Sequence, residues 1–241
     1  DERISCHLGL KTGANQIFLD PPDDLEPEVL RWALRGRDLR PFQAEARLRL
    51  LWTHGQGGAP HRFLPPRATA YLAPHLPRLR RRADFDGGPP WAVFRTGPAT
   101  AAHRVTWADL ARRLTAVALT GPGDQDRIPL NSCYVAALDG ADKAERVAAW
   151  LNSTWVRAMA RIGAVRAASG FGRFTAATVG ALPLPGAVLT DPYLAAVAQA
   201  GRRGDPVQSE LDAIVARHLR LSPAAQSALR GVERDRTVHS G

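Results

Sequence analysis

The sequence predicts a mixed α+β fold, in which a twisted, mainly antiparallel sheet is flanked by helices and followed by a small C-terminal helical appendage. Two observations support this class. Short segments that alternate polar with apolar residues, separated by turns rich in Gly and Pro, recur over residues 1–185 and are typical of strands. From Gly186 onward the apolar residues follow a helical spacing. We therefore expect two parts, residues 1–185 and residues 186–241.

The size and composition of the chain are those of a soluble globular protein. Its 241 residues can bury a substantial core, and 45% of them are hydrophobic while 23% are charged. It has no run of about 18 apolar residues and no secretory leader pattern, so we expect a cytoplasmic protein with no membrane partner. Because Asp1 lies in what is patterned as a structured segment, we expect the chain to be excised from a longer protein.

The charge of the chain favours a polyanionic partner. The formal net charge is +9, and only Lys11 and Lys143 are lysines, so the other 30 of the 32 basic residues are arginine. A high-GC source explains a preference for arginine over lysine, but it does not explain an excess of basic over acidic residues. Arginine suits phosphates and guanine edges, which makes nucleic acid the partner that this charge indicates.

The chain opens with a turn that is bracketed by Gly9 and Gly13. These glycines let the backbone bend and approach a neighbour closely, and the turn carries the hydrogen-bonding residues Lys11 and Asn15. We expect a short apolar strand to follow directly, ending at Leu19.

The next segments bring arginines close together. Acidic residues in the first turn and Gly36 just past the end predict a short helix over Glu26–Leu34. Arg47–Trp52 alternates as a half-buried strand does, with arginines on one face. Pro65–Arg82 is patterned as a helix interrupted by prolines. It ends in an arginine cluster that is either a solvated face or a contact to phosphates, namely Arg78, Arg80, Arg81 and Arg82.

Several strands and one strong helix are expected after this cluster. The strands are predicted over Trp91–Phe94, His103–Trp107, Thr115–Leu119 and Ile128–Leu138. The helix begins near Asp139 and has one apolar stripe made of Val147, Leu151, Trp155, Ala158 and Ile162. The Ser169–Phe174 loop is either a hydrophobic plug or a DNA-facing loop that stacks or wedges.

The C-terminal helices carry their own start signals. Asp191 and Asp205 each precede a proline, as an N-cap residue does. The stripe over Leu211–Leu219 is amphipathic, and we expect His218 within it to be a packed core histidine.

The chain does not contain a complete active site. Its seven histidines are scattered, Cys6 and Cys133 lack metal-ligand spacing, and neither a phosphate-binding loop nor a dinucleotide fingerprint is present. The carboxylates over residues 20–28 suit a helix start better than a metal site. We therefore expect no catalytic residue, no metal and no cofactor in this chain.

Several short motifs, taken in order, resemble the C-terminal target-recognition domain of Taq-type N6-adenine DNA methyltransferases, which belong to restriction-modification and phage-defence systems. The opening match is Gly9, Lys11, Thr12, Gly13, Asn15 and Phe18. Further matches are Leu34–Asp38, His103–Asp109, Ile128–Tyr134, Ala149–Ser153, Gly172–Phe174 and Leu182–Pro185. Asp20–Asp23 echoes the catalytic loop of such enzymes, but Asp23 stands where an aromatic residue would stack on a flipped base, so we expect a plain turn.

The resemblance implies a division of labour. In the family, an N-terminal Rossmann-like domain binds S-adenosylmethionine and flips the target adenine. The domain that this chain resembles grips double-stranded DNA and reads its sequence, so residues 1–185 would be the DNA target-recognition domain and residues 186–241 a trailing helical segment. The catalytic domain of the same parent protein would be the second partner. The residues expected to contact DNA are Lys11, Asn15, Arg35, Arg37, Arg104 and Arg173.

Two other functions remain open at this point. The stripe over Leu211–Leu219 is compatible with a protein-interaction module of a multi-subunit phage-defence system. An independent nuclease is the third hypothesis.

Overall fold

The computed structural model describes residues 3–55 and 57–234, and it confirms the mixed α+β class. Its central sheet has four antiparallel strands in the order β1-β10-β6-β8. The bounds of these strands are Cys6–Leu8 (β1), Cys133–Ala137 (β10), Arg104–Ala108 (β6) and Ala116–Leu119 (β8). In the register of the two inner strands, Cys133 pairs with Ala108 and Ala137 with Arg104, so residues 104 and 108 mark opposite ends of the sheet.

Three smaller sheets surround the central one. β2 (Leu30–Leu34) pairs with β5 (Leu48–Leu51) and, in parallel, with β9 (Arg127–Pro129). β7 (Leu110–Ala111), β11 (Val165–Arg166) and β12 (Gly172–Arg173) form a second sheet with β12 in the middle. The third is the pair β3 (Leu39–Arg40) and β4 (Gln43–Ala44).

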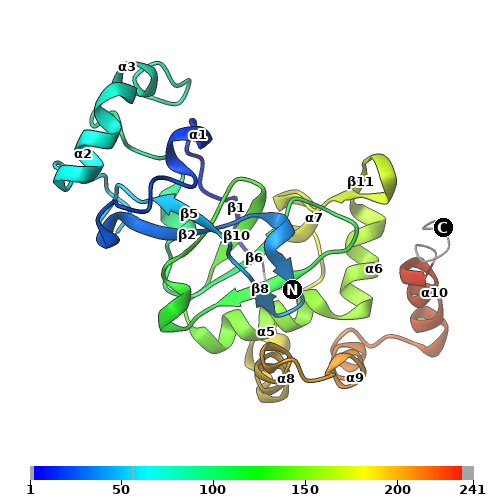
Figure 1. Ribbon diagram of the computed structural model, residues 1–241. Helices are drawn as coiled ribbons and strands as arrows, with labels where there is room; N and C mark the ends of the chain where they lie inside the picture. Colours follow the sequence, from blue (N-terminus) through cyan, green and yellow to red (C-terminus); the bar gives the residue numbers. More distant parts are fainter. Residues whose placement is uncertain (1–2, 56, 235–241) are drawn as a thin grey trace.

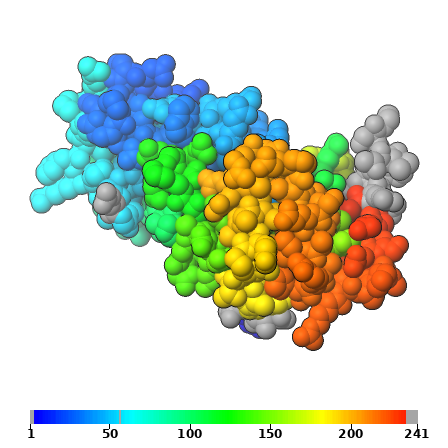
Figure 2. All heavy atoms as spheres, turned by 90° about the horizontal axis from the view of Figure 1, so that it is seen from below, coloured from blue at the N-terminus to red at the C-terminus, as the bar shows by residue number. Residues whose placement is uncertain are grey.

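Helices cover the lower side of the central sheet in two layers (Figure 1). α5 (Ala141–Asn152) packs against β6 and β8, and α6 (Thr154–Gly163) continues from it. α8 (Pro192–Arg203) packs on α5, α9 (Gln208–His218) contacts α5, α6 and α8, and α10 (Pro223–Arg234) packs on α6. Figure 2 shows these C-terminal helices, orange to red, spread over the face seen from below.

The other helices are short. α1 (Asn15–Phe18) follows the opening turn, while α2 (Pro66–Leu72) and α3 (Leu76–Leu79) build a projection at the upper left of Figure 1. α4 (Thr96–Ala99) precedes β6, and α7 (Ala176–Gly180) follows β12. The 3-10 turns are Pro27–Val29 (η1), Gly36–Asp38 (η2), Ala73–His75 (η3), Pro122–Asp124 (η4), Ala168–Gly170 (η5) and Gly186–Thr190 (η6).

Of the three hydrophobic clusters among the described residues, the two largest hold these layers together. The larger joins the central sheet to α5, α6, α8 and α9, with Trp107, Trp150 and Trp155 among its buried side chains. The smaller joins β2 and β5 to α1 and to the α2–α3 projection, around Phe18 and Leu72. The helices after residue 186 therefore share the larger core with the sheet.

The helix predicted over Glu26–Leu34 is wrong. Only η1 is helical there, and Leu30–Leu34 is the middle strand of its sheet. Pairing with strands on both sides outweighs the acidic start signal, because local helix preference is a weak force against tertiary contacts.

The predicted strands after the opening turn and over Trp91–Phe94 are also wrong. Asn15–Phe18 forms the helical turn α1, whose Ile17 and Phe18 are buried. In the second segment only Phe94 pairs, through an isolated bridge to Lys11. Ile128–Leu138 holds two strands, β9 and β10, instead of one.

The helix that begins near Asp139 exists but is broken at Ser153. This residue ends α5 and caps α6, its hydroxyl accepting a hydrogen bond from the backbone N–H of Val156 at 3.3 Å. The break rotates α6, so Ile162, which was assigned to the buried stripe, is 66% exposed.

The start signals of the C-terminal helices are half right. Asp191 caps α8, as predicted, by accepting from the backbone N–H groups of Tyr193 and Leu194. Asp205 does not cap α9, which begins at Gln208. His218 is only partly buried, and its Nε2 lies 2.6 Å from a carboxylate oxygen of Asp191.

Candidate nucleic-acid interface

The turn from Leu130 to Cys133, between β9 and β10, is where three separate segments of the chain meet. The backbone N–H of Gly9 donates to the Cys133 carbonyl at 2.9 Å. The backbone N–H of Gly36 donates to the Ser132 hydroxyl at 3.2 Å, and that of Asp109 donates to the Ser132 carbonyl at 3.0 Å. We call this segment, residues 130–133, the central turn.

Two of these approaches require glycine. A Cβ atom on Gly9 would lie 2.3 Å from the Leu130 carbonyl oxygen, and one on Gly36 would lie 2.8 Å from the Ala108 Cβ. Such distances are too short for any side chain, so only glycine lets these backbones touch the central turn and the end of β6. The opening turn and η2 are thereby fixed beside each other.

Lys11 and Asn15 lie on the opening turn, as expected. The Lys11 ammonium forms an ion pair with Asp84 at 2.5 Å, and this hydrogen bond lowers the pKa of the Asp84 carboxyl. The exposed Asn15 begins α1, and its Oδ1 accepts a hydrogen bond from the Thr12 hydroxyl at 2.6 Å.

Arg35 and Arg37 flank Gly36 on η2. The Arg35 guanidinium binds Asp38 through Nε at 3.0 Å and Nη2 at 3.1 Å, and the buried carboxylate of Asp38 also accepts from the Arg35 backbone at 2.8 Å. Arg37 is exposed, and the residues that the structure describes give its side chain no partner. It is an exposed positive charge next to Gly36, which binds the central turn.

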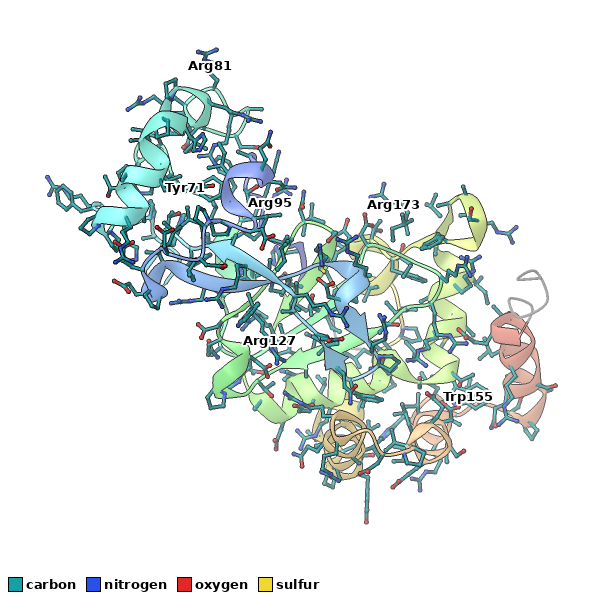
Figure 3. All side chains as sticks on the ribbon, in the orientation of Figure 1. Tyr71, Arg81, Arg95, Arg127, Trp155 and Arg173 are labelled. Carbon is teal, nitrogen blue, oxygen red and sulfur yellow. The ribbon has the colours of Figure 1, made fainter. Side chains whose placement is uncertain are left out.

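Arg173 lies on β12 and points to the upper side of the molecule (Figure 3). Its Nε lies 3.3 Å from Oδ1 of Asp109, and its Nη2 pairs with Oδ2 of the same carboxylate. This pairing raises the pKa of the Arg173 guanidinium. Asp109 is the residue whose backbone binds the central turn, so Arg173 joins the same group of segments.

Arg104, the remaining expected DNA contact, is buried, and its assignment is corrected here. It sits at the opposite end of β6 from the central turn and is 0% exposed. Its guanidinium donates to the backbone carbonyls of Ala101, Asp124 and Arg127 at 2.6, 2.7 and 2.7 Å. Burial lowers its pKa to about 10, so it remains charged at pH 7 while holding loops together.

The arginine cluster that ends the α2–α3 projection also contains both exposed and buried side chains. Arg78, Arg80 and Arg81 are exposed, and Figure 3 shows Arg81 at the tip of the projection. Arg82 is buried and donates to the carbonyls of Thr12, Pro90 and Ala92 at 2.5, 2.7 and 2.7 Å. Arg82 thus fastens the base of the projection to the opening turn.

Arg95 was missed by the sequence-based prediction. It is exposed on the same upper side as Arg173 (Figure 3), and its φ of 62° places a non-glycine residue in the left-handed region. Asp20, Phe42, Ser169 and Arg220 also have positive φ, so this conformation alone does not mark Arg95 as functional. No sequence signal marks it, because an isolated arginine before a short helix is unremarkable in a chain this rich in arginine.

The two aromatic residues of the Ser169–Phe174 loop have different surroundings. Phe174 is fully buried, and its carbonyl accepts a hydrogen bond from the Trp107 indole at 2.8 Å. Phe171 is half-buried beneath the guanidinium of Arg112, which lies 5.5 Å from the ring centroid. Phe174 therefore acts as the plug.

Residues 3–55 and 57–234 contain no group of three or more His, Cys, Asp or Glu side chains placed to hold a metal ion. Within the same residues, no helix combines the length and apolar character needed to cross a membrane. A hollow below β2 is lined by Trp52, His54, His61, Phe63 and Asp126. Burial lowers the pKa of its His54 to about 4, so that ring is neutral at pH 7.

The fold is similar to part of a restriction-modification enzyme. No family model and no curated protein matches the chain. Among solved structures, it is similar to the Type IIL restriction-modification enzyme MmeI in complex with DNA, with a TM-score of 0.61 at 13% sequence identity. The match covers 98% of this chain and 36% of the MmeI chain. At this identity the similarity shows a shared fold.

Proposed function

We propose that this chain is a sequence-specific double-stranded DNA recognition module of a restriction-modification enzyme. The observation that carries the proposal is the convergence at the central turn. The segments that carry Lys11, Arg37 and Arg173 are far apart in the sequence, and they are tied to this one turn through Gly9, Gly36 and Asp109. Phosphate and base-edge contacts both require such groups on a rigid scaffold.

Two further observations support DNA as the partner. The formal net charge of +9 favours a polyanion, and exposed arginines on the α2–α3 projection extend the basic surface. The chain also shares its fold with a segment of MmeI, a restriction-modification enzyme whose structure was determined in complex with DNA.

The finer proposal concerns the parent protein. The motif resemblance supports an N6-adenine DNA methyltransferase of the Taq type, in which a separate domain binds S-adenosylmethionine and carries the chemistry. Under this proposal the present chain contributes DNA recognition, and the catalytic domain of the same protein is its second partner.

The salt dependence of DNA binding tests the main proposal. We expect the chain to bind duplex DNA at low salt and log Kd to rise linearly with log salt, because phosphate contacts release counterions. Arg37→Met removes an exposed, unpaired charge near the central turn, so the salt slope should fall by about one. Fluorescence anisotropy with a labelled duplex measures both.

Arg203→Met is the matched control. Arg203 is an exposed arginine that is paired with Asp205 and ends α8, a helix on the lower side of the molecule in Figure 1. Its replacement should leave the slope unchanged. Absence of duplex binding at low salt, or binding that ignores salt, would contradict the proposal.

The protein-interaction alternative loses its motivating feature. Leu211, Ile214 and Val215, which form the amphipathic stripe of α9, are at most 4% exposed because they pack within the larger core. The stripe is covered by the chain itself.

A further inference from the structure

Arg35 and Arg173 share an arrangement that their sequence positions do not reveal. Each guanidinium is held along the same edge, Nε and Nη2, by one aspartate. In each pair the aspartate lies below and the arginine faces solvent. The side chains are 23% exposed for Arg35 against 6% for Asp38, and 53% for Arg173 against 13% for Asp109.

The two pairs lie close to one another. η2, which carries Arg35, packs against β6 and β7, and Asp109 separates these two strands. Both aspartates are fixed through the backbone as well. Asp38 accepts from the Arg35 backbone N–H at 2.8 Å, while the backbone of Asp109 binds Ser132 and accepts from the Phe174 N–H at 2.7 Å.

This geometry leaves the opposite edge of each guanidinium free. Within residues 3–55 and 57–234 the structure gives Nη1 of Arg35 and Nη1 of Arg173 no partner. The free edge offers two parallel N–H donors, from Nη1 and from the second hydrogen of Nη2. Guanine is the base that presents two acceptors, N7 and O6, side by side in the major groove, whereas adenine presents a donor beside N7.

The surroundings of Arg173 strengthen this inference. In the register of the small sheet, Arg173 stands between Val165 and Leu110, which are 66% and 50% exposed. Apolar neighbours on both sides offer the guanidinium no competing acceptor.

We propose that Asp38 and Asp109 are positioning residues that present Arg35 and Arg173 end-on to two guanines, so that the chain selects duplexes with guanine at two positions. The inference rests on the proposed function and adds the base that is read. Fixing the arginine matters because a free guanidinium binds phosphates and bases alike, whereas a fixed one accepts a single geometry.

Selection from a library of duplexes with a randomised segment tests the inference. The wild-type chain should enrich sites with guanine at two positions. Arg173→Lys and Asp109→Asn should lower the preference for guanine about ten-fold at the same one of these positions, while Arg35→Lys does so at the other. The lysine variants keep the charge, so a purely electrostatic role would leave the base preferences unchanged.

Replacement of guanine by 7-deazaguanine, which lacks the N7 acceptor, provides a second readout. Wild type should lose about ten-fold in affinity when the base at the Arg173 position is replaced, and Arg173→Lys should lose almost nothing further, because both changes remove one interaction. Arg203→Lys and Asp205→Asn are the matched controls, since both members of that pair are exposed.

The outcomes separate the two proposals. If wild type binds no duplex, the proposed function fails. If it binds but enriches sites without guanine, or if Asp109→Asn keeps the wild-type base preference, the guanine inference fails while DNA binding stands. Thermal unfolding of each variant checks the fold. Arg35→Lys tests the role of Arg35 in base preference and leaves the buried carboxylate of Asp38 in place.

Discussion

At the scale of single residues, burial separates two roles of arginine in this chain. Arg82, Arg104 and Arg157 are at most 8% exposed, and their guanidinium groups donate to backbone carbonyls of neighbouring loops. Burial lowers the pKa of Arg104 and of Arg157 to about 10, so both stay charged at neutral pH. Under the proposed function, exposed arginines such as Arg37 are the ones that contact DNA.

The structural role of Arg104 predicts a loss of stability. We expect Arg104→Met to lower the free energy of unfolding by about 3 kcal/mol, because three backbone carbonyls, one buried and two part-buried, lose their donor. Arg37→Met should change it by less than about 0.5 kcal/mol, as surface substitutions usually do. Urea unfolding followed by tryptophan fluorescence measures both. Wild-type stability together with weakened DNA binding in Arg104→Met would restore Arg104 as a DNA contact.

The error over Arg104 has a physical cause. The alternation His103–Trp107 predicted the strand correctly, but every residue of β6 is buried because both faces of this inner strand are covered. Alternation marks exposure only in strands with one solvated face. Motif position selected Arg35, Arg37, Arg104 and Arg173 alike as DNA contacts, and it gave no information on which of these arginines is buried.

At the scale of elements, α8 and α9 are tied by the pair of Asp191 and His218. Burial alone would raise the pKa of Asp191. The hydrogen bonds from His218 and from the backbone N–H groups at the start of α8 outweigh it, so this pKa is lowered. The carboxylate thus serves as helix cap and as ion-pair partner at once.

This pair predicts a sensitivity to acid. Because the pKa of Asp191 is lower in the folded chain than in the unfolded chain, the unfolded state binds more protons as the pH falls. The contribution of Asp191 is therefore present above its unfolded value of about 3.9 and is lost as the pH falls through the folded value. Asp191→Asn should be less stable than wild type at pH 7, and the difference should shrink toward pH 2. Urea midpoints across this range test it, and a constant difference would contradict it.

Element prediction succeeded where the pattern was long and failed where it was short. The helical stripe after Asp139 spans two helices and was recognised, although the cap at Ser153 divided it. Glu26–Leu34 was assigned from a few charges at its start, and pairing with distant strands then decided its structure. Partners such as β5 and β9 cannot be read from the segment itself.

At the scale of the whole molecule, the C-terminal helices are part of the main core. Five of the apolar side chains after residue 186 are at most 2% exposed, namely Val188, Leu194, Val197, Leu211 and Val215. Arg202 of α8 also reaches the buried carboxylates of Asp124, at 2.8 Å, and of Glu145. The division into a DNA target-recognition domain, residues 1–185, and a helical segment, residues 186–241, stays a prediction.

Truncation at that boundary should therefore unfold the chain. Each of the five buried side chains contributes about 1.5–3 kcal/mol, so their sum is on the order of 10 kcal/mol, comparable with the whole stability of a domain. We expect a chain ending at Pro185 to lose cooperative thermal unfolding, measured by circular dichroism. A chain ending at Ser222, which lacks only α10, should melt at a lower temperature but cooperatively. A stable, folded 1–185 fragment would refute this expectation.

The central turn has a consequence for how new DNA specificities would arise. The central turn is the common anchor of three segments of the chain, so under the proposed function an insertion or deletion there would displace the DNA-contacting arginines together. The side chains of Asp109 and Arg173 pair with each other, and the contact of Asp109 with the central turn is made by its backbone N–H. Under both proposals, substitutions at these residues should therefore change which base is preferred, while the spacing between the recognised base positions stays as it is.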